Sequence, residues 1–268
     1  MTATLQEKAH AFEALHTSGT FVIPNFWDCG SAVMLERLGF QALASTSAGF
    51  AQAIGKLDGR VTLDEKLTHL ASVAACTNAP VSADFENGFA DQPDAVAANL
   101  MRAAQTGIVG ASIEDWSGTT LYDFDHAVER IAACVEAATQ LDFPFTLTAR
   151  AENLLRGVND LDDTIRRLQA FEAAGANVLY APGLSSLEQV QAVLDAVSKP
   201  VNVLFAFMPD KSFSDYETIG VRRISLGGAL ANHAIGATLS AARMMLEGGD
   251  FSWVMQAAPG KVIRQLLD

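Results

Sequence analysis

Acidic side chains stand at the ends of several short apolar segments of this chain. Asp84 and Glu86 end one such segment, Glu114 and Asp115 end the next, and Arg150 ends a third. Burying several carboxylates close together costs many kcal/mol unless a cation compensates their charge. Oxygen ligands without a histidine or thiolate cluster favour a hard divalent cation such as Mg2+ or Mn2+. The pattern therefore predicts a divalent-metal site.

Arg150 is the cation that the sequence places among these acids. Its planar guanidinium suits a bidentate carboxylate or phosphonate, so we expect an anionic substrate. For several of the acidic residues, a structural role remains an alternative to metal binding. Glu114 could form an ion pair with Arg150, Asp84 and Glu86 could cap a turn, and Asp28 could cap the helix that follows it.

Short β-branched segments alternate with longer segments of helical periodicity, which is typical of βαβ units and a parallel sheet. The eight expected strands are residues 20–26, 42–46, 81–86, 110–115, 145–150, 177–181, 201–205 and 222–227. Helices are expected at 63–77, 93–107, 124–139, 161–175 and 187–197. This order predicts an α/β fold, a closed (β/α)8 TIM-type barrel in one domain spanning 1–268, with chemistry at the carboxyl ends of the strands.

Two helical segments lie outside the eight repeats. One is an extra helix at 3–17, and the other is a C-terminal helical extension at about 229–268 that carries Phe251 and Trp253. Surplus apolar helix at a chain end needs a partner surface, so we expect a homo-oligomer.

Composition excludes several classes of protein. The 268 residues carry a formal net charge of −13, which disfavours nucleic acid and anionic lipid as partners. No apolar segment approaches the roughly 18 residues that cross a membrane, so we expect no membrane contact. Cys29, Cys76 and Cys134 show no paired spacing, which fits a reducing, cytoplasmic location.

Two further features have weaker interpretations. The five histidines fall in expected helices, where packing or solvent exposure is the favoured reading. Residues 225–230, SLGGAL, could bind phosphate through backbone amides, or the glycines could let a helix approach the sheet.

Several motifs together resemble the isocitrate lyase and phosphoenolpyruvate mutase superfamily over residues 20 to 230. They are GFQALASTSAGFAQAIGKLD (39–58), SADFENGFA (82–90), SIEDW (112–116), TARAEN (148–153), PVNVL (200–204) and VRRISLGG (221–228). The resemblance implies that Asp84 binds the metal directly, and that Glu86 replaces the second acid of the family's motif. It also implies that Asp58 and Glu114 act on the metal through water.

The same resemblance implies the substrate contacts. Arg150 and Asn202 would hold the anionic end of the substrate, and the backbone amides around Ser47 and Ala48 would hold the oxygen and carboxylate of an enolate. The hydroxyls of Thr46 and Ser47 can assist. Asp58, Glu114 and Arg150 are the residues expected to take part in catalysis.

The implied activity is that of a Mg2+-dependent lyase or hydrolase. It would cleave a C–C bond in a small 2-oxo or 2-hydroxy (di)carboxylic acid through a metal-stabilised enolate. The resemblance also implies a dimer of dimers, a homotetramer in which a C-terminal helix is exchanged between neighbours.

Two loops depart from the known branches of this superfamily. Residues 86–95 lack the Cys, Lys and His of isocitrate and methylisocitrate lyases, and 116–125 lack the Lys of the mutases. The second loop offers Tyr122 and Asp123 as proton donors, or it forms a lid. Alternatives are therefore P–C bond chemistry on a phosphonopyruvate-like substrate, and a non-catalytic 2-oxo-acid binding protein.

Overall fold

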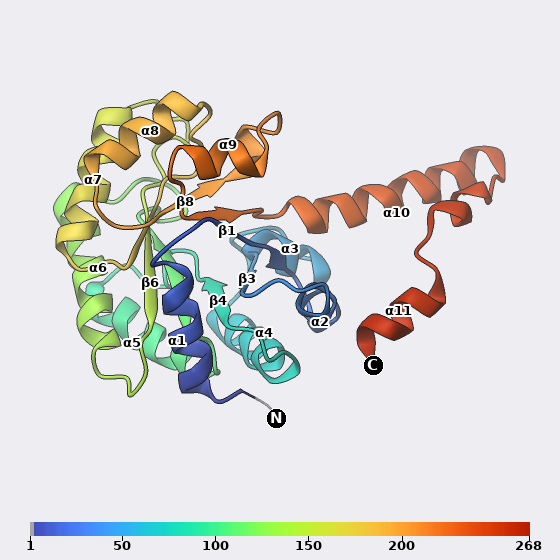
Figure 1. Ribbon diagram of the computed structural model, residues 1–268, viewed down its shortest axis with the longest axis horizontal. Coiled ribbons are helices and arrows are strands. Elements are labelled where there is room, and N and C mark those ends of the chain that lie inside the picture. The colour runs from blue at the N-terminus through green and yellow to red at the C-terminus, as the bar shows by residue number, and fades with distance from the viewer. Residues whose placement is uncertain (1–2) are drawn as a thin grey trace.

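A computed structural model describes residues 3–268 (Figure 1). Its strands are β1 Phe21–Ile23, β2 Asn25–Phe26, β3 Leu43–Ser45, β4 Val81–Asp84, β5 Gly110–Glu114, β6 Thr146–Arg150, β7 Val178–Tyr180, β8 Val201–Leu204 and β9 Arg223–Ser225. The α-helices are α1 Leu5–Leu15, α2 Cys29–Arg37, α3 Ser47–Ala53, α4 Leu63–Cys76, α5 Pro93–Ala104, α6 Phe124–Ala138, α7 Leu161–Ala173, α8 Leu187–Ala196, α9 Phe213–Thr218, α10 Ala229–Gly248 and α11 Gly260–Leu267. Two 3-10 helices, η1 and η2, span Phe205–Phe207 and Ser252–Gln256.

Within residues 3–268, the nine strands form one parallel sheet in the order β1-β9-β8-β7-β6-β5-β4-β3-β2. β1 and β2 are two halves of one barrel strand separated by Pro24, which has no backbone N–H to donate to a neighbour. The first half pairs with β9 and the second with β3, so the sheet closes on itself. The predicted (β/α)8 barrel and its eight strand positions are confirmed, and the expected strand at 20–26 is divided by Pro24.

The helices begin where side chains can accept the first free backbone N–H groups. Asp28 accepts from Ser31 N at 2.7 Å at the start of α2, so the capping role weighed for Asp28 is present. At the start of α4, Thr62 and Glu65 form a reciprocal capping box. These caps fix the helix ends that follow the candidate site loops.

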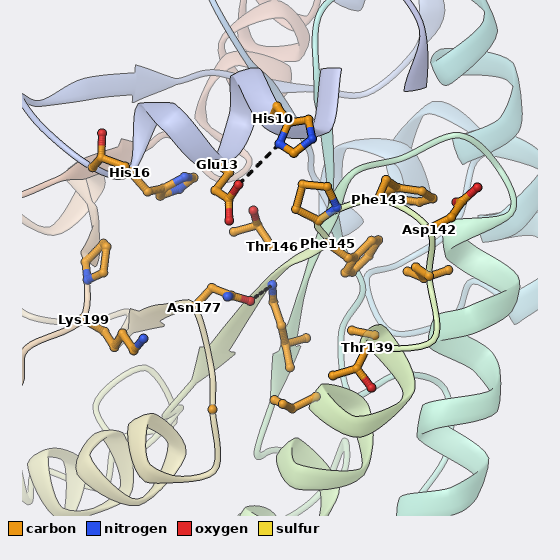
Figure 2. A pocket seen from close by; sticks show the side chains of 18 residues that line it. His10, Glu13, His16, Thr139, Asp142, Phe143, Phe145, Thr146, Asn177 and Lys199 are labelled. Atoms are coloured by element: carbon orange, nitrogen blue, oxygen red, sulfur yellow. Dashed lines mark hydrogen bonds and ion pairs between the residues drawn. The ribbon is translucent and has the colours of Figure 1, made fainter. Parts of the chain in front are cut away.

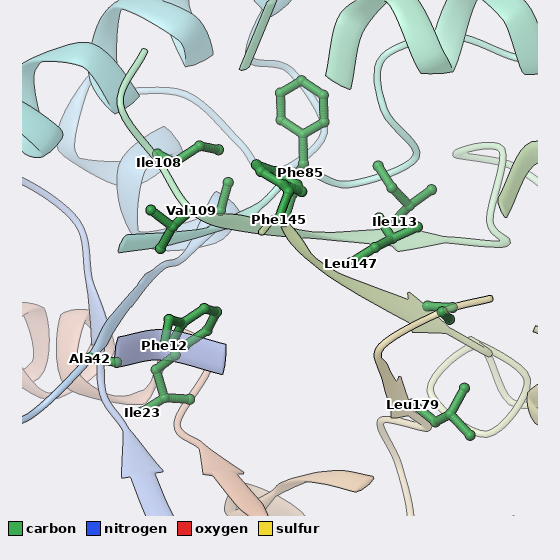
Figure 3. Close-up of a cluster of buried hydrophobic side chains, with 14 of the residues drawn as sticks. Phe12, Ile23, Ala42, Phe85, Ile108, Val109, Ile113, Phe145, Leu147 and Leu179 are labelled. Carbon is green, nitrogen blue, oxygen red and sulfur yellow. The ribbon is translucent and has the colours of Figure 1, made fainter. Parts of the chain in front are cut away.

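Apolar side chains fill the space between the strands and the surrounding helices. Figure 3 shows part of this core, including Ile113 on β5 and Leu147 on β6, both at most 1% exposed. α1 covers the amino-terminal end of the barrel, where a Cβ added to Gly110 would come within 2.9 Å of the Phe12 ring. The lower end of the barrel is therefore closed, and the upper end is left for polar side chains.

The chain after β9 leaves the barrel. Figure 1 shows α10 extending away from the barrel and the following segment returning, and α11 contacts α2. Leu246, Phe251 and Met255 on this extension are 87%, 65% and 85% exposed. Among the described residues, no helix has both the length and the apolar character needed to cross a membrane.

Candidate active site

The carboxyl ends of β3 to β6 bring the expected site residues together. Parallel strands present these ends at one edge of the barrel, and Asp84, Glu114 and Arg150 are the last residues of β4, β5 and β6. Glu114 pairs with Arg150 in the β5–β6 register. The shared strand ends and this register therefore bring the three side chains together.

Arg150 lies at the centre of a carboxylate network. Its guanidinium contacts Asp84 at 2.8 Å, Glu114 at 3.0 Å and Glu152 at 2.7 Å. Burial opposes its charge, but these three carboxylates raise the pKa of Arg150 well above its ordinary value. Arg150 is thus a permanent cation, the expected ion pair with Glu114 is present, and Arg150 lines both hollows of the site.

Asp84 holds both the arginine and the turn after β3. One carboxylate oxygen accepts from Arg150, and the other accepts from the backbone N–H of Ser47 at 2.9 Å. Burial raises the pKa of Asp84, but Arg150, Lys66 and the Ser47 N–H outweigh it and bring the value below the ordinary one. Asp84 is therefore ionised, and the Ser47 amide assigned to an enolate donates to this carboxylate here.

Glu86 has the least satisfied carboxylate of the site. Its backbone has a φ of 50°, which is unusual for a residue other than glycine, and its N–H and carbonyl lie in the turn that enters the β4–α5 loop. Its Oε1 is buried without a hydrogen-bond partner. Burial and the charge of Asp84 raise the pKa of Glu86 to about 7.

Lys66 is a site residue that the sequence analysis missed. It lies in α4, is fully buried, and donates from Nζ to the Ser45 hydroxyl oxygen at 3.1 Å. The same oxygen accepts from Asp84 N at 2.9 Å. Burial lowers the pKa of Lys66, while the charges of Asp84, Glu86 and Asp58 oppose that change. It lies on the buried face of α4 together with Leu70 and Val73, and the sequence analysis assigned this helix no site residue.

Arg156 is a second cation missed by the sequence analysis. It contacts Glu152 at 3.0 Å and Glu114 at 3.5 Å, and its guanidinium lies 4.8 Å from the centre of the Trp116 ring. Burial nevertheless raises the pKa of Glu114 well above its ordinary value. The four-residue spacing of Glu152 and Arg156 was the signal that could have found this pair.

Two connected hollows open at this end of the barrel. An inner chamber of about 160 Å³ lies inside the barrel, and an outer cavity of about 780 Å³ lies under the loops. Ser47, Asp58, Arg150 and Leu155 line both. The other expected substrate residues, Thr46, Ala48, Asp84 and Asn202, line the inner chamber, and the expected metal ligands Glu86 and Glu114 line the outer cavity.

These carboxylates fit a hard cation that takes part of its shell from water or substrate. The donors are all oxygen, and the unpartnered Glu86 Oε1 beside Asp84 is a ligand atom that a cation would satisfy. Across residues 3–268, no three His, Cys, Asp or Glu side chains form a complete ligand cage. The expected ligands Asp84, Glu86, Glu114 and Asp58 thus face connected hollows without enclosing a site.

The loop at 116–125 differs from one expectation. The Tyr122 hydroxyl donates to Asp91 at 2.5 Å, and its ring lies 4.1 Å from the Arg130 guanidinium. Tyr122 lines neither hollow, whereas Thr119 lines the outer cavity. Because its hydroxyl is committed to Asp91 and burial raises the pKa of Tyr122 to about 12, it is not placed as a proton donor.

Another cavity, of about 640 Å³, lies at the amino-terminal end of the barrel (Figure 2). His10, Glu13, Thr139, Asn177 and Lys199 are among the side chains around it. None of the acids described above lines this cavity. Its size therefore does not make it a second candidate for the same chemistry.

Comparisons with known proteins agree with this geometry. The family described as phosphoenolpyruvate phosphomutase matches residues 12–246. An oxaloacetate decarboxylase of Paraburkholderia xenovorans LB400 is 28% identical over 90% of this chain and 82% of its own. A solved structure of a candidate lyase/mutase from Burkholderia cenocepacia J2315 is 49% identical, with a TM-score of 0.94 over 97% of this chain and 95% of its own.

A phosphonopyruvate hydrolase solved with oxalate and Mg2+ shares the fold, with 21% identity and a TM-score of 0.85 over 97% of this chain and 94% of its own. The family match covers most of the barrel and includes every expected site residue. The chain is therefore an enzyme that belongs to the phosphoenolpyruvate phosphomutase family, within the isocitrate lyase and phosphoenolpyruvate mutase superfamily.

Proposed function

We propose that this enzyme is a Mg2+-dependent lyase or hydrolase that cleaves a C–C bond in a small 2-oxo or 2-hydroxy (di)carboxylic acid through an enolate. The observation that carries the proposal is the buried, unpartnered Oε1 of Glu86 beside the ionised Asp84, opposite Arg150. This arrangement combines oxygen ligands for a cation with a fixed positive charge for an anion.

Asp84, with Glu86, Asp58 and Glu114, would hold Mg2+ or Mn2+. When bound, the cation withdraws electrons from the 2-oxo group and lowers the energy of the enolate. Arg150 and Asn202 orient the carboxylate of the substrate from the inner chamber. Thr46, Ser47 and Ala48 line the same chamber, where the Ala48 amide and the Thr46 hydroxyl can donate to developing negative charge. The amides of Thr46 and Ser47 already donate to the Phe26 carbonyl and to Asp84.

The runner-up is P–C bond chemistry on a phosphonopyruvate-like substrate. The family description favours it, because it names a phosphomutase. The loop at 116–125 carries no lysine to manage a phosphoryl group, whereas a C–C reaction leaves no phosphoryl group to be held. The oxaloacetate decarboxylase relative also acts at a C–C bond, which supports the proposed C–C bond cleavage over the runner-up.

A product assay separates the two reactions. Purified enzyme with Mg2+ is incubated with oxaloacetate, 2-methylisocitrate, 2,3-dimethylmalate and phosphonopyruvate, and the products are followed by NMR. The proposal predicts C–C cleavage of one of the first three, to a 2-oxo acid and a second fragment or, by hydrolysis of oxaloacetate, to oxalate and acetate, and no turnover with a chelator. Turnover of phosphonopyruvate alone, either to pyruvate and inorganic phosphate or to phosphoenolpyruvate, would favour the runner-up, and chelator-insensitive turnover would contradict both.

We also propose that the chain 1–268 forms one barrel domain and assembles as a cytoplasmic homotetramer, a dimer of dimers that exchanges its C-terminal helix. The exposed Leu246, Phe251 and Met255 on the extension support an apolar contact with another copy. Light scattering of the wild type and of a Leu246→Glu, Phe251→Glu variant tests this. The proposal predicts a tetramer that the double variant dissociates, and a monomeric wild type would contradict it.

A further inference from the structure

The inner chamber contains a buried cation that the proposed reaction does not use. Arg223, at the start of β9, is 5% exposed and lines the chamber together with Arg150. Its strand position pairs with Asn202 of β8, so both side chains belong to the same layer of the barrel interior. This layer lies below the one that holds Arg150 and the carboxylates.

Every hydrogen-bond partner of Arg223 in the described chain is neutral. Nε donates to Asn202 Oδ1 at 2.8 Å and Nη2 donates to Thr148 Oγ1 at 2.9 Å. Nη1 lies 3.3 Å from Nε2 of His16. Three of the five guanidinium N–H groups are thus used, and none meets a carboxylate.

His16, which contacts Arg223, contributes no negative charge. Its Nδ1 lies 2.8 Å from the Phe12 carbonyl oxygen and donates to it, which leaves Nε2 to accept from Arg223. Burial and the nearby Arg223 lower the pKa of His16 to about 3, so the ring is neutral. His16 also lies at the rim of the cavity at the amino-terminal end of the barrel, as Figure 2 shows.

A buried guanidinium without an anion is costly, because the charge loses its hydration and gains only neutral dipoles. Burial lowers the pKa of Arg223 to about 10, which leaves it fully ionised near neutral pH. The chamber beside it has room for a ligand. The chamber has a volume of about 160 Å³, whereas a cavity that holds one water molecule needs only about 10–15 Å³ by the same measure.

The polar lining of the chamber also suits a carboxylate. The hydroxyls of Ser82, Ser112 and Ser225 line it with Asn202 and the two arginines. Thr148, which holds Arg223, stands two residues before Arg150 on β6, and two residues of a strand span about 6–7 Å. Arg223 and Arg150 therefore lie at successive levels of β6 and line one chamber, so a short dicarboxylate inside it can contact both guanidinium groups.

We propose that Arg223 forms an anion subsite inside the barrel that binds the second carboxylate of a dicarboxylic acid, whose first carboxylate lies beside Arg150. The inference deepens the proposed function and rests on it for the position of the first carboxylate. It assigns the substrate class as a short dicarboxylic acid, and it makes Arg223 a specificity-determining residue outside the metal site.

Succinate and butyrate test this directly, because they share a four-carbon chain and differ in the second carboxylate. Isothermal titration in Mg2+ is carried out on the wild type, Arg223→Met, Arg223→Lys and the control Arg222→Met. Arg222 is the adjacent arginine, and it contacts the Gly19 carbonyl outside the chamber. Folding of each variant is checked by circular dichroism and by its melting temperature.

The wild type should bind succinate at least about tenfold more tightly than butyrate, and Arg223→Met should reduce that ratio to about one. Arg223→Lys should retain part of the preference, and Arg222→Met should retain all of it. Equal affinity of the wild type for the two acids would overturn the inference even if Arg223→Met failed to fold. A preference that survives in Arg223→Met would overturn it as well.

Failure of the proposed function would give a different result. If the wild type binds no 2-oxo acid in a Mg2+-dependent manner but Arg223 still selects succinate, the proposed reaction fails and the subsite stands. If Mg2+-dependent turnover is found and the succinate preference is absent, the reaction stands and the subsite fails.

Discussion

Arg150 and Arg223 are both buried inside one barrel, and their surroundings are opposite. Arg150 contacts three carboxylates, whereas Arg223 contacts an amide, a hydroxyl and a neutral imidazole. The upper layer, around Arg150, has more carboxylates than its arginine can neutralise. The lower layer, around Arg223, has a cation without an anion. An entering dianion is therefore attracted by the lower layer, and the upper layer needs a metal ion before it attracts an anion.

Removing the charge of the upper layer should have the largest effect. Arg150→Met leaves Asp84, Glu114 and Glu152 without their shared partner, so we expect a loss of about 3–5 kcal/mol of stability. We also expect a loss of about a thousandfold in kcat/KM. Urea unfolding and steady-state kinetics measure the two effects.

Arg130→Met is the matched control for Arg150→Met, because Arg130 is buried, donates hydrogen bonds to backbone carbonyls of the β4–α5 loop, lies over the Tyr122 ring, and contacts none of the site carboxylates. It should lower stability with a much smaller effect on catalysis. Equal kinetic losses in the two variants would remove Arg150 from the site.

Asp84→Asn should have the next largest effect. The amide keeps the shape of the side chain but loses the charge that a divalent cation needs, so Mn2+ affinity should fall about a hundredfold. Electron paramagnetic resonance of free Mn2+ measures this without any substrate. Asp64→Asn, an exposed aspartate paired with Arg102, should leave the affinity unchanged. Unchanged Mn2+ binding in Asp84→Asn would place the cation elsewhere.

The lower layer predicts a pH dependence of stability. The pKa of His16 is about 3 in the fold, compared with 6.5 for an unperturbed histidine, so the unfolded chain binds a proton first as the pH falls. Its contribution to stability is complete above pH 6.5 and is lost as the pH falls towards 3. From pH 7.5 to pH 5 the loss is about 2 kcal/mol.

Urea unfolding of the wild type and of His16→Gln isolates this effect, because the acids with raised pKa are common to both proteins. The substitution should cost about 2 kcal/mol less at pH 5 than at pH 7.5. His10→Gln is the control, since that ring is exposed. A cost for His16→Gln that is independent of pH would show that His16 is not held neutral.

The smallest effect is expected from Lys66. Its ammonium faces the carboxylates of Asp84, Glu86 and Asp58, so Lys66→Met should tighten Mn2+ binding about tenfold. The control is Lys8→Met, a buried lysine that donates to the Thr77 carbonyl far from the acids. If Lys66→Met weakens Mn2+ binding instead, the lysine supports the site mainly through packing.

The sequence predicted the barrel because its strands and helices differ in hydrophobic period and in length. It also predicted that Asp84, Glu114 and Arg150 meet, since strand ends of a parallel barrel share one edge. The interruption at Pro24 was visible as a residue without an N–H donor, but its effect on the pairing with both neighbours depends on the closure of the sheet.

The remaining parts of the site depend on contacts that no local pattern encodes. Lys66 reaches the acids from the expected helix at 63–77, and Tyr122 is taken out of the site by a contact with Asp91, far away in sequence. Arg223 lay in the expected strand at 222–227 and was given no role of its own. Its lack of a carboxylate partner becomes visible only when the neighbouring strands are placed beside it.

Oxalate binding by the wild-type enzyme, followed by titration calorimetry with Mg2+ and again with a chelator, tests the central claim most directly. Oxalate resembles the planar carboxylate and oxygen pair of an enolate, and the claim is that carboxylates at the strand ends hold a cation for such a group. The account predicts binding that requires Mg2+ and is lost in Asp84→Asn. Equal oxalate affinity with and without Mg2+ would contradict it.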